Sequence, residues 1–265
     1  MSKKIIITGG LGYIGTELCK LYSGVSWNHK ITVIDNRFIS ERVNQIRNWN
    51  MEFIQGDILD KDLINQHFKD ADIVHHLAGI TDVPRTKSQS NIEKDKKIRL
   101  VGEEGTQNIL DVINDNCKII FPSTHVIYEG IDKVEKEIKE DAESKPILSY
   151  STSKDINEKQ LKKSGKNYVI LRLGSVYGYS TDTTRIDIMP NLFSKIASQN
   201  GTLNLFSGGR QIKSLVPLID VARCFKFMEE REDLTFDTFN LTKDTITVKK
   251  VAEICKKYNP KITLR

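Results

Sequence analysis

The 265-residue chain is poor in cysteine, with only Cys19, Cys117, Cys224 and Cys255, and it contains no Cys-x-x-Cys pair. This spacing argues against a zinc site and a disulfide framework, so we expect no bound metal and a reducing compartment. Long apolar runs are also missing. No stretch reaches the ~18 apolar residues of a membrane span, and the N-terminus lacks the pattern of a secretory signal peptide. We therefore predict a cytoplasmic protein that contacts no membrane.

A strong excess of one charge is absent too. The chain has 40 Lys and Arg against 35 Asp and Glu, which gives a net charge of +5. No basic block is interleaved with aromatic residues, the pattern that favours nucleic-acid binding, so we expect no nucleic-acid partner. The densest charged run, Asp132–Glu143, mixes both signs and predicts an exposed loop.

The most informative feature that is present is a glycine-rich turn near the N-terminus. An apolar stretch, Lys4–Thr8, is followed by glycines at positions 9, 10, 12 and 15. The first two allow a tight turn, Gly12 allows the backbone to approach a pyrophosphate, and Gly15 allows the next helix to pack closely. Asp35 follows Gly15 by twenty residues and ends a second apolar stretch, where a carboxylate binds ribose hydroxyls. The pattern predicts a dinucleotide site; the alternative is a strand–helix turn without a ligand.

Strand-like and helical stretches alternate up to Leu173, which predicts a doubly wound parallel sheet of the Rossmann type in the α/β class. The expected strands are Ile5–Thr8, Ile31–Ile34, Met51–Gln55, Ile73–Leu77, Lys118–Pro122 and Tyr168–Leu173, and the expected helices are Thr16–Tyr22, Lys61–Phe68, Lys97–Asn116 and Ser151–Ser164. Further helices are expected near Pro190–Gln199, over Asp220–Glu230 and over Val248–Tyr258 with Thr247 as its cap. We assign 1–175 to the nucleotide domain, with 213–232 returning to it. The segments 176–212 and 233–265 form a small C-terminal substrate-binding lobe.

Tyr150 and Lys154 lie four residues apart at the start of an expected helix, so both side chains project from one face. A free tyrosine has a pKa of about 10, and a nearby ammonium lowers that pKa by favouring the phenolate. This arrangement suits a general base, although an amphipathic helix with an extended lysine is the simpler interpretation. Thr124 follows another expected strand and could hydrogen-bond a substrate oxygen.

The motifs resemble the extended short-chain dehydrogenase/reductase family, in its NAD-dependent nucleotide-sugar epimerase/dehydratase branch, and UDP-glucose 4-epimerases in particular. The resemblance is collinear and covers nearly the whole chain. It is carried by Thr8–Gly15, Val33–Asn36, Gly56–Ile58, His75–Gly79, Ser123 and Thr124 before Val126–Tyr128, Tyr150 with Lys154, Leu171–Gly178, Gly208–Gln211, Asp220 and Phe239–Leu241.

The resemblance implies a role for each matching residue. The implied cofactor-binding residues are Gly9, Gly12, Tyr13, Ile14 and Gly15 at the pyrophosphate, Asp35 and Asn36 at the adenosine ribose, Asp57 and Ile58 at the adenine, Leu77, Ala78 and Gly79 along the cofactor, and Ser123. Thr124, Tyr150 and Lys154 correspond to the catalytic triad, with Tyr150 and Lys154 also contacting the cofactor. The implied substrate-binding residues are Thr81, Thr124, His125, Ser175 and Lys213. Alternatives stay open: Asp57 as a turn residue, 77–79 as strand packing, and His76 as a structural residue in the wall of the fold.

Departures from the family pattern reduce the number of reactions that we expect this chain to catalyse. The family's 4,6-dehydratases carry an Asp-Glu pair after the catalytic Thr, and its decarboxylases carry the Glu, whereas this chain has His125 and Val126. Gly102 and Ser175 stand where the family usually has Asn. Lys213 replaces an Arg, which loses bidentate geometry on a diphosphate. The chain also stops at Arg265, before relatives usually end, so we expect a shortened substrate lobe.

We therefore predict an NAD-dependent 4-epimerase of a nucleotide-diphosphate sugar, acting through a transient 4-keto intermediate. One alternative is a net NAD(P)-dependent reductase or dehydrogenase of a keto-sugar nucleotide. Another is a non-catalytic NAD-binding sensor or scaffold. NAD is expected over NADP because Asp35 repels a 2′-phosphate, although Arg37 follows it. The resemblance implies a homodimer formed through the helices at about Lys97–Asn116 and Ser151–Ser164.

Overall fold

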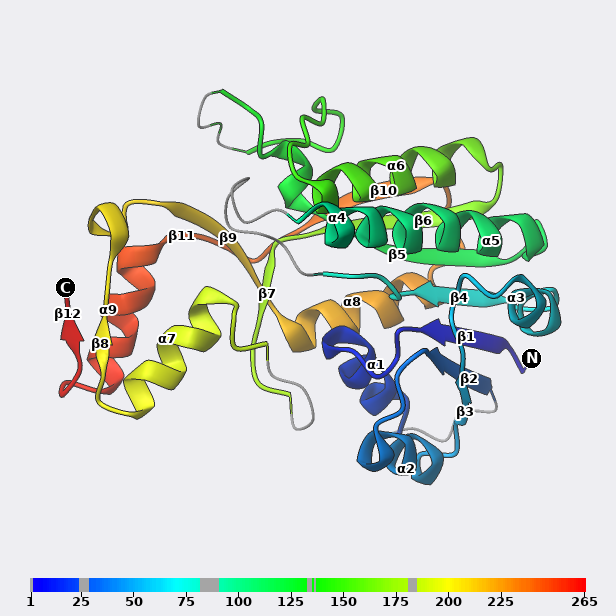
Figure 1. Ribbon diagram of the computed structural model, residues 1–265, viewed down its shortest axis with the longest axis horizontal. Helices are drawn as coiled ribbons and strands as arrows, with labels where there is room; N and C mark the ends of the chain where they lie inside the picture. Colours follow the sequence, from blue (N-terminus) through cyan, green and yellow to red (C-terminus); the bar gives the residue numbers. More distant parts are fainter. Residues whose placement is uncertain (1, 24–28, 82–90, 133–134, 136, 181–184) are drawn as a thin grey trace.

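The computed structural model describes residues 2–23, 29–81, 91–132, 135, 137–180 and 185–265, which form a large α/β domain and a smaller lobe (Figure 1). The strands are β1 (Lys4–Thr8), β2 (Lys30–Asp35), β3 (Glu52–Gln55), β4 (Ile73–His76), β5 (Lys118–Thr124), β6 (Asn167–Leu173), β7 (Ser175–Tyr177), β8 (Thr202–Leu203), β9 (Ile212–Pro217), β10 (Asp237–Leu241), β11 (Asp244–Thr247) and β12 (Thr263–Leu264). The helices are α1 (Tyr13–Ser23), α2 (Ser40–Asn48), α3 (Lys61–Phe68), α4 (Ile92–Arg99), α5 (Gly105–Val112), α6 (Ser149–Lys163), α7 (Met189–Ser198), α8 (Leu218–Glu230) and α9 (Val248–Tyr258).

The large sheet has seven strands in the order β10-β6-β5-β4-β1-β2-β3, and every neighbouring pair is parallel. The strand order reverses between β1 and β4, since successive strands run outward from this point in both directions. In a doubly wound sheet, ligands bind beyond the carboxyl ends of the strands at such a point. This arrangement confirms the predicted fold class.

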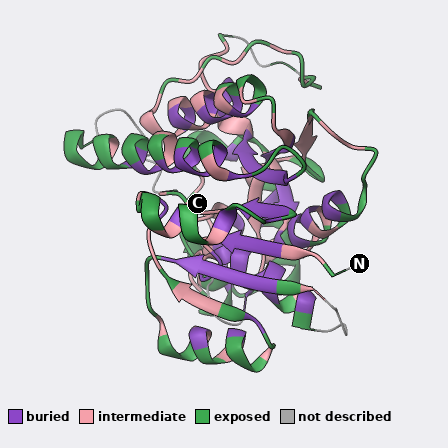
Figure 2. Cartoon of the chain, turned by 90° about the vertical axis from the view of Figure 1, so that its right-hand side faces the viewer, coloured by how far each residue is buried: buried purple, intermediate pink, exposed green. Residues whose placement is uncertain are grey.

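Side chains alternate between two cores, one on each face of the sheet, because successive residues of a strand point to opposite faces. Ile5 and Ile7 belong to the core shared with α1, α2 and α8, whereas Ile6 belongs to the core shared with α3, α5 and α6. Figure 2 shows the strands as the buried centre of the domain, with exposed surface on the outer sides of the helices. Both faces of the sheet are therefore covered, and its carboxyl edge is where a ligand finds access.

The smaller lobe contains a three-stranded sheet, β11-β9-β7, and the short parallel pair β12-β8. Helices α7 and α9 pack together over a third core, which includes Phe193, Leu203, Val251 and Ile262. Thr247 caps α9, as predicted, by accepting a hydrogen bond from the Lys250 N–H. The lobe thus has its own apolar centre, next to the carboxyl edge of the large sheet (Figure 1).

Two segments lie elsewhere than the sequence analysis places them. Residues 237–241, assigned there to the lobe, form β10 and pair with β6 at the edge of the large sheet. Residues 213–217, the first part of the segment 213–232 expected to return to the nucleotide domain, belong to β9 in the sheet of the lobe, while α8 after them packs on α1. Short strands carry little information about their pairing partner, since pairing is decided by tertiary packing.

The helix expected over Lys97–Asn116 is interrupted. A π-helical turn, Leu100–Glu104, separates α4 from α5. Gly102 lies in this turn, and a Cβ atom there would approach the Ser153 Oγ of α6 to 2.3 Å. The Asn157 side chain donates to the Gly102 carbonyl at 2.9 Å. Glycine at this position therefore permits a close approach of the two helical segments that a side chain would block.

The described part of Asp132–Glu143 is a loop with mostly exposed residues, as its mixed charges predict. It is tethered at its end, where the Glu140 carboxylate accepts the backbone N–H of Asn240 in β10 at 2.8 Å. Among the residues that the structure describes, no helix is long and apolar enough to cross a membrane.

Candidate active site

A cavity of about 1070 Å³ opens at the carboxyl edge of the large sheet and extends toward the lobe. Nearly all predicted site residues line it: Gly9, Gly12, Tyr13, Ile14, Gly15, Asp35, Asn36, Asp57, Ile58, Leu77, Ala78, Gly79, Thr81, Ser123, Thr124, His125, Tyr150, Lys154 and Ser175. Lys213 is the exception. It is exposed on β9, outside the lining, although its charge lowers the pKa of His125.

The glycine-rich turn lies at the reversal point between β1 and β4. Gly9 has a φ of +68°, and a Cβ atom there would lie 2.8 Å from the Ala78 backbone nitrogen. A Cβ atom on Gly15 would lie 2.5 Å from the Gly9 carbonyl oxygen. Only glycine satisfies both the backbone conformation at position 9 and the close packing of α1. The turn leaves the N-terminus of α1 facing the cavity, a geometry suited to phosphate.

Asp35 ends β2 with its side chain buried at the cavity wall. One carboxylate oxygen accepts the Leu11 N–H at 3.0 Å, and the other accepts the Arg37 backbone N–H at 3.0 Å and its Nε–H at 3.2 Å. The carboxylate thus braces the glycine-rich turn in addition to facing the cavity. The carboxylate also forms an ion pair with Arg37, which lines the same cavity.

Three other predicted cofactor residues have partners within the protein. The Tyr13 hydroxyl donates to the Gly178 carbonyl and accepts from Asn191, so the ring links the glycine-rich turn to the segment before α7. The Asp57 carboxylate accepts the Leu59 N–H and the Asn36 amide, both at 3.0 Å. Asp57 is therefore a turn residue, the alternative left open from the sequence, and it also lines the cavity.

Tyr150 and Thr124 face each other at the carboxyl end of β5. Burial raises the pKa of Tyr150, while the positive charge of Arg185 and a hydrogen bond with Thr124 oppose that rise. The four-residue spacing on α6 predicts Lys154 as the cation that lowers this pKa. Arg185 takes that role in the structure, because the Lys154 ammonium points to the strand.

Lys154 lies one helical turn after Tyr150 on α6. Its Nζ donates to the Pro122 carbonyl at 2.8 Å and lies 4.2 Å from the centroid of the Phe121 ring. Burial lowers the pKa of Lys154 to about 7, and the charge of Glu158 opposes the fall. The ammonium is therefore anchored to β5 at the cavity wall and is readily deprotonated near neutral pH.

Arg185 is a site residue that the sequence analysis missed. Its guanidinium donates to the Thr81 hydroxyl at 3.1 Å and pairs with Asp187, and all three residues line the cavity. It lies in a polar segment without hydrophobic periodicity, so only its position in the fold identifies it. The guanidinium is within electrostatic reach of Tyr150 and lowers the pKa of its phenol.

The two histidines near the site differ in environment. His125 lines the cavity, and its Nδ1 lies 2.8 Å from the Leu173 carbonyl, to which it donates. Burial lowers its pKa, so the ring is neutral and its Nε2 is an acceptor. His76 is buried in β4 between the hydroxyls of Thr8 and Thr106, each 3.0 Å away. It is the structural residue anticipated from the sequence.

Ser175 and Ser123 have different surroundings from one another. Ser175 begins β7 and is half-buried at the cavity wall. Ser123 also lines the cavity, but its hydroxyl donates to the Glu158 carboxylate of α6 at 2.5 Å. The Ser123 hydroxyl therefore already has a hydrogen-bond partner within the protein. Only the other atoms of Ser123 are left for the predicted contact with a cofactor.

Comparison with known proteins agrees with this geometry. Residues 5–242 match the NAD dependent epimerase/dehydratase family. A UDP-N-acetyl-alpha-D-glucosaminuronate decarboxylase of Bacillus cytotoxicus is 29% identical, with 89% of this chain and 70% of that protein covered. A dTDP-D-glucose 4,6-dehydratase of Dictyostelium discoideum is 26% identical over 88% of this chain and 56% of its own length. A UDP-glucose 4-epimerase of Mycoplasma genitalium is 24% identical over 90% and 76%.

Solved structures show the same fold. A UDP-glucuronic acid 4-epimerase of Bacillus cereus, in complex with UDP-glucuronic acid and NAD, superposes with a TM-score of 0.81 at 23% identity, covering 99% of this chain and 85% of that one. The family match spans most of the sequence, including every element of the large sheet. The chain therefore belongs to the NAD dependent epimerase/dehydratase family of nucleotide-sugar enzymes.

Proposed function

We propose that this protein is an NAD-dependent epimerase that inverts C4 of a nucleotide-diphosphate sugar through a transient 4-keto sugar. One observation carries the proposal. Thr124, Tyr150 and Lys154 meet at the wall of the cavity that also contains the glycine-rich turn. A hydroxyl pair and an ammonium beside a dinucleotide site suit oxidation and reduction of a sugar hydroxyl.

The cavity residues fit NAD. The α1 N-terminus and the close approach permitted by Gly9 suit the pyrophosphate, and the Asp35 carboxylate at the end of β2 suits the ribose hydroxyls. Ile58 and Leu77 supply apolar contacts for the adenine and for the length of the cofactor. When bound, NAD supplies a hydride acceptor and donor beside the sugar.

Tyr150 acts as the acid and base. Its phenolate would take the proton of the C4 hydroxyl while bound NAD would accept the C4 hydride, which gives the carbonyl of the 4-keto sugar. After the sugar rotates in the site, reduction of the opposite face of C4 by the same cofactor would be accompanied by return of the proton from Tyr150. Thr124 hydrogen-bonds the phenol, and Arg185 favours its charged form against the effect of burial. Lys154 holds the ribose side of the site from its anchor on β5.

Epimerisation is favoured over dehydration and decarboxylation by what lies beside Thr124. His125 and Val126 follow it, and neither supplies the carboxylate that an elimination needs as a second acid or base. Four carboxylates line the cavity among the described residues: Asp35 and Asp57 at the adenosine end, Asp95 on α4, and Asp187, which pairs with Arg185. Epimerisation requires only one acid–base group.

The alternatives make different predictions. A net reductase exchanges NAD(P)H with solution at every turnover, whereas an epimerase returns its cofactor unchanged. A sensor or scaffold binds NAD without turnover. We also propose a homodimer through α4, α5 and α6, and a cytoplasmic location, which the four unpaired cysteines fit.

The test is incubation of the protein with NAD and single UDP-sugars, with and without a uronic carboxylate, followed by ¹H NMR, which resolves 4-epimers of equal mass. Cofactor released by denaturation is identified alongside. We expect interconversion of one 4-epimer pair with no net change in the absorbance of reduced nicotinamide. Net NADH consumption with a keto-sugar would indicate the reductase, and binding of NAD without any product would indicate the sensor.

Two substitutions test the roles proposed for Tyr150 and Lys154. Tyr150→Phe should lower turnover roughly 10²–10⁴-fold with NAD affinity little changed, because the ring still packs. Lys154→Met should impair both turnover and NAD affinity. The matched controls are Tyr258→Phe, exposed on α9, and Lys163→Met, exposed on α6. A Tyr150→Phe protein with full activity would show that the motif is structural.

A further inference from the structure

Helix α6 forms side-chain hydrogen bonds with two consecutive residues of strand β5, Pro122 and Ser123. Lys154 donates to the Pro122 carbonyl at 2.8 Å, and one turn later Glu158 accepts the Ser123 hydroxyl at 2.5 Å. Residues four apart on a helix share a face, so Tyr150 belongs to the same stripe as these two. The next residue of β5 after Ser123 is Thr124. The contacts therefore connect the strand end that carries Thr124 with the helix that carries Tyr150.

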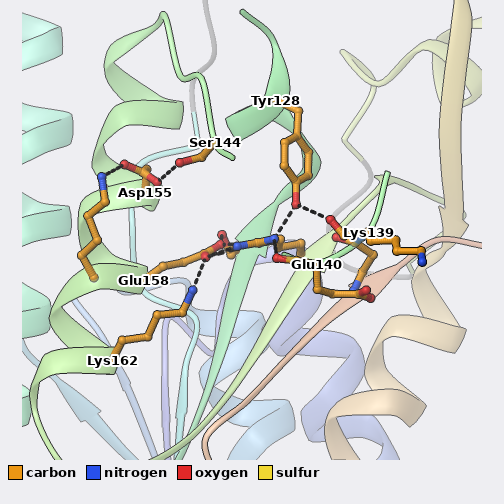
Figure 3. Close-up of polar contacts among 11 residues, drawn as sticks. Tyr128, Lys139, Glu140, Ser144, Asp155, Glu158 and Lys162 are labelled. Carbon is orange, nitrogen blue, oxygen red and sulfur yellow. Dashed lines mark hydrogen bonds and ion pairs between the residues drawn. The ribbon is translucent and has the colours of Figure 1, made fainter. Parts of the chain in front are cut away.

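Glu158 is itself held from the other side by β6. Arg172 lies in register with Ser123 across the β5–β6 pair. Its Nε and Nη2 donate to the Glu158 carboxylate at 3.0 and 2.7 Å, and both side chains are buried. Lys162 adds a contact at 3.5 Å from its more exposed position on α6 (Figure 3). A buried bidentate pair fixes direction as well as distance, so Glu158 has little freedom to move.

Arg172 is anchored in turn. Its Nη1 donates to the Tyr128 hydroxyl and to the Glu140 carbonyl, the latter at 2.7 Å, and Figure 3 shows Tyr128 and Glu140 apart from Glu158, on the other side of this contact network. The Tyr128 hydroxyl also donates to the Lys139 carbonyl at 3.3 Å. Ser123 and Glu158 thus join a network that continues through Arg172 and Tyr128 into the loop after β5.

We propose that Glu158 is a positioning residue, which locks the end of β5 against α6 so that Thr124, Tyr150 and Lys154 keep their mutual geometry. The inference rests on the proposed function only in taking these three residues as the reacting group. Glu158 does not line the cavity that holds Thr124, Tyr150 and Lys154, so it acts on that site through Ser123 and through α6.

A second consequence is electrostatic. The charged and titratable groups that interact with Lys154 are Glu158 from α6 and His76 from β4, and Tyr150 shares its helix face. Of the carboxylates in the described residues, Glu158 is the one whose charge acts on Lys154, and it keeps the pKa of that lysine from falling below about 7. Loss of its charge therefore lowers the fraction of protonated Lys154.

The experiment compares Glu158→Gln and Ser123→Ala with the control Asp155→Asn. Asp155 is a buried carboxylate next to Lys154 in α6, but it binds Ser144 and Lys159, each at 2.6 Å, away from β5 (Figure 3). The pKa of Lys154 is measured by pH-dependent amine labelling with peptide mass spectrometry, which needs no turnover. NAD affinity, thermal unfolding and epimerase rate are measured in parallel.

We expect Glu158→Gln to lower the pKa of Lys154, and a fall of about one pH unit in that pKa reduces the protonated fraction above pH 7 about tenfold. We expect kcat to fall roughly 10- to 100-fold in Glu158→Gln and in Ser123→Ala, because small displacements of reacting groups are costly. Ser123→Ala keeps the carboxylate and should leave the pKa of Lys154 unchanged. Asp155→Asn should change neither quantity.

Wild-type kcat in Ser123→Ala, or a wild-type pKa of Lys154 in a folded Glu158→Gln protein, would overturn the proposal. Glu158→Gln leaves Arg172 without its charged partner and is the variant most exposed to misfolding. Ser123→Ala leaves that pair intact, so the proposal stays falsifiable. If the wild type turns over no nucleotide-sugar, the proposed function fails, whereas the labelling and NAD titrations still decide the role of Glu158.

Discussion

Acidification should destabilise this protein through His76. The ring is buried in β4 between Thr8 and Thr106, and burial together with the charge of Lys154 lowers its pKa from 6.5 to about 3. Between pH 6.5 and pH 3, this histidine is protonated in the unfolded chain but neutral in the folded chain. The folded state therefore loses stability as the pH falls from 6.5 toward 3. For a single group with these two pKa values, the loss between pH 7 and pH 4 is roughly 3 kcal/mol.

Urea unfolding of the wild type and of His76→Gln at pH 7 and pH 4 measures this contribution. Glutamine can hydrogen-bond a threonine hydroxyl but does not titrate. We compare the difference in free energy of unfolding between the variant and the wild type at the two pH values, and on going from pH 7 to pH 4 this difference should shift by roughly 3 kcal/mol in favour of the variant. Glu229, whose pKa is lowered to about 2, also titrates in acid. Both proteins retain it, and its contribution cancels. A gap that is the same at both pH values would refute the reasoning.

Three further outcomes can be checked. Asp35→Asn should lower the preference for NAD over NADP by about tenfold, because it removes a negative charge and releases Arg37 toward a 2′-phosphate; titration calorimetry with an unchanged ratio would contradict this. Gly102→Ala should destabilise the fold by about 1–3 kcal/mol despite the better helix propensity of alanine, and adding Ser153→Ala should recover part of the loss, since the new Cβ lies 2.3 Å from the Ser153 Oγ. Light scattering at micromolar concentration should give a dimer mass, and a monomer mass would exclude the proposed association.

The parts that sequence reasoning reached are those encoded locally. The apolar strand before Gly9, the carboxylate of Asp35 at the next strand end, and the four-residue spacing of Tyr150 and Lys154 each reflect a short-range rule. Parallel strands bring their carboxyl ends to one edge, so these separate motifs converge once the sheet forms. Hence nearly all predicted residues line one cavity.

The parts that it missed depend on tertiary packing. The pairing of β10 with β6 and the presence of Arg185 in the cavity have no periodic signal in the chain. Helix α2, Ser40–Asn48, was not anticipated because it is polar with few buried residues. The direction of the Lys154 ammonium, toward Pro122 and not Tyr150, follows from the placement of β5. Spacing along a helix predicts a shared face but not a partner.

The route of the chain between the two sheets bears on protein engineering. After β6 the chain enters the lobe, returns to the large sheet with α8 and β10, and leaves again with β11 and α9 (Figure 1). No single cut separates the two parts, so a protease that nicks one connection releases no independent fragment. Grafting the lobe of a relative to change specificity needs several splice points, and β10 must be retained with its host sheet.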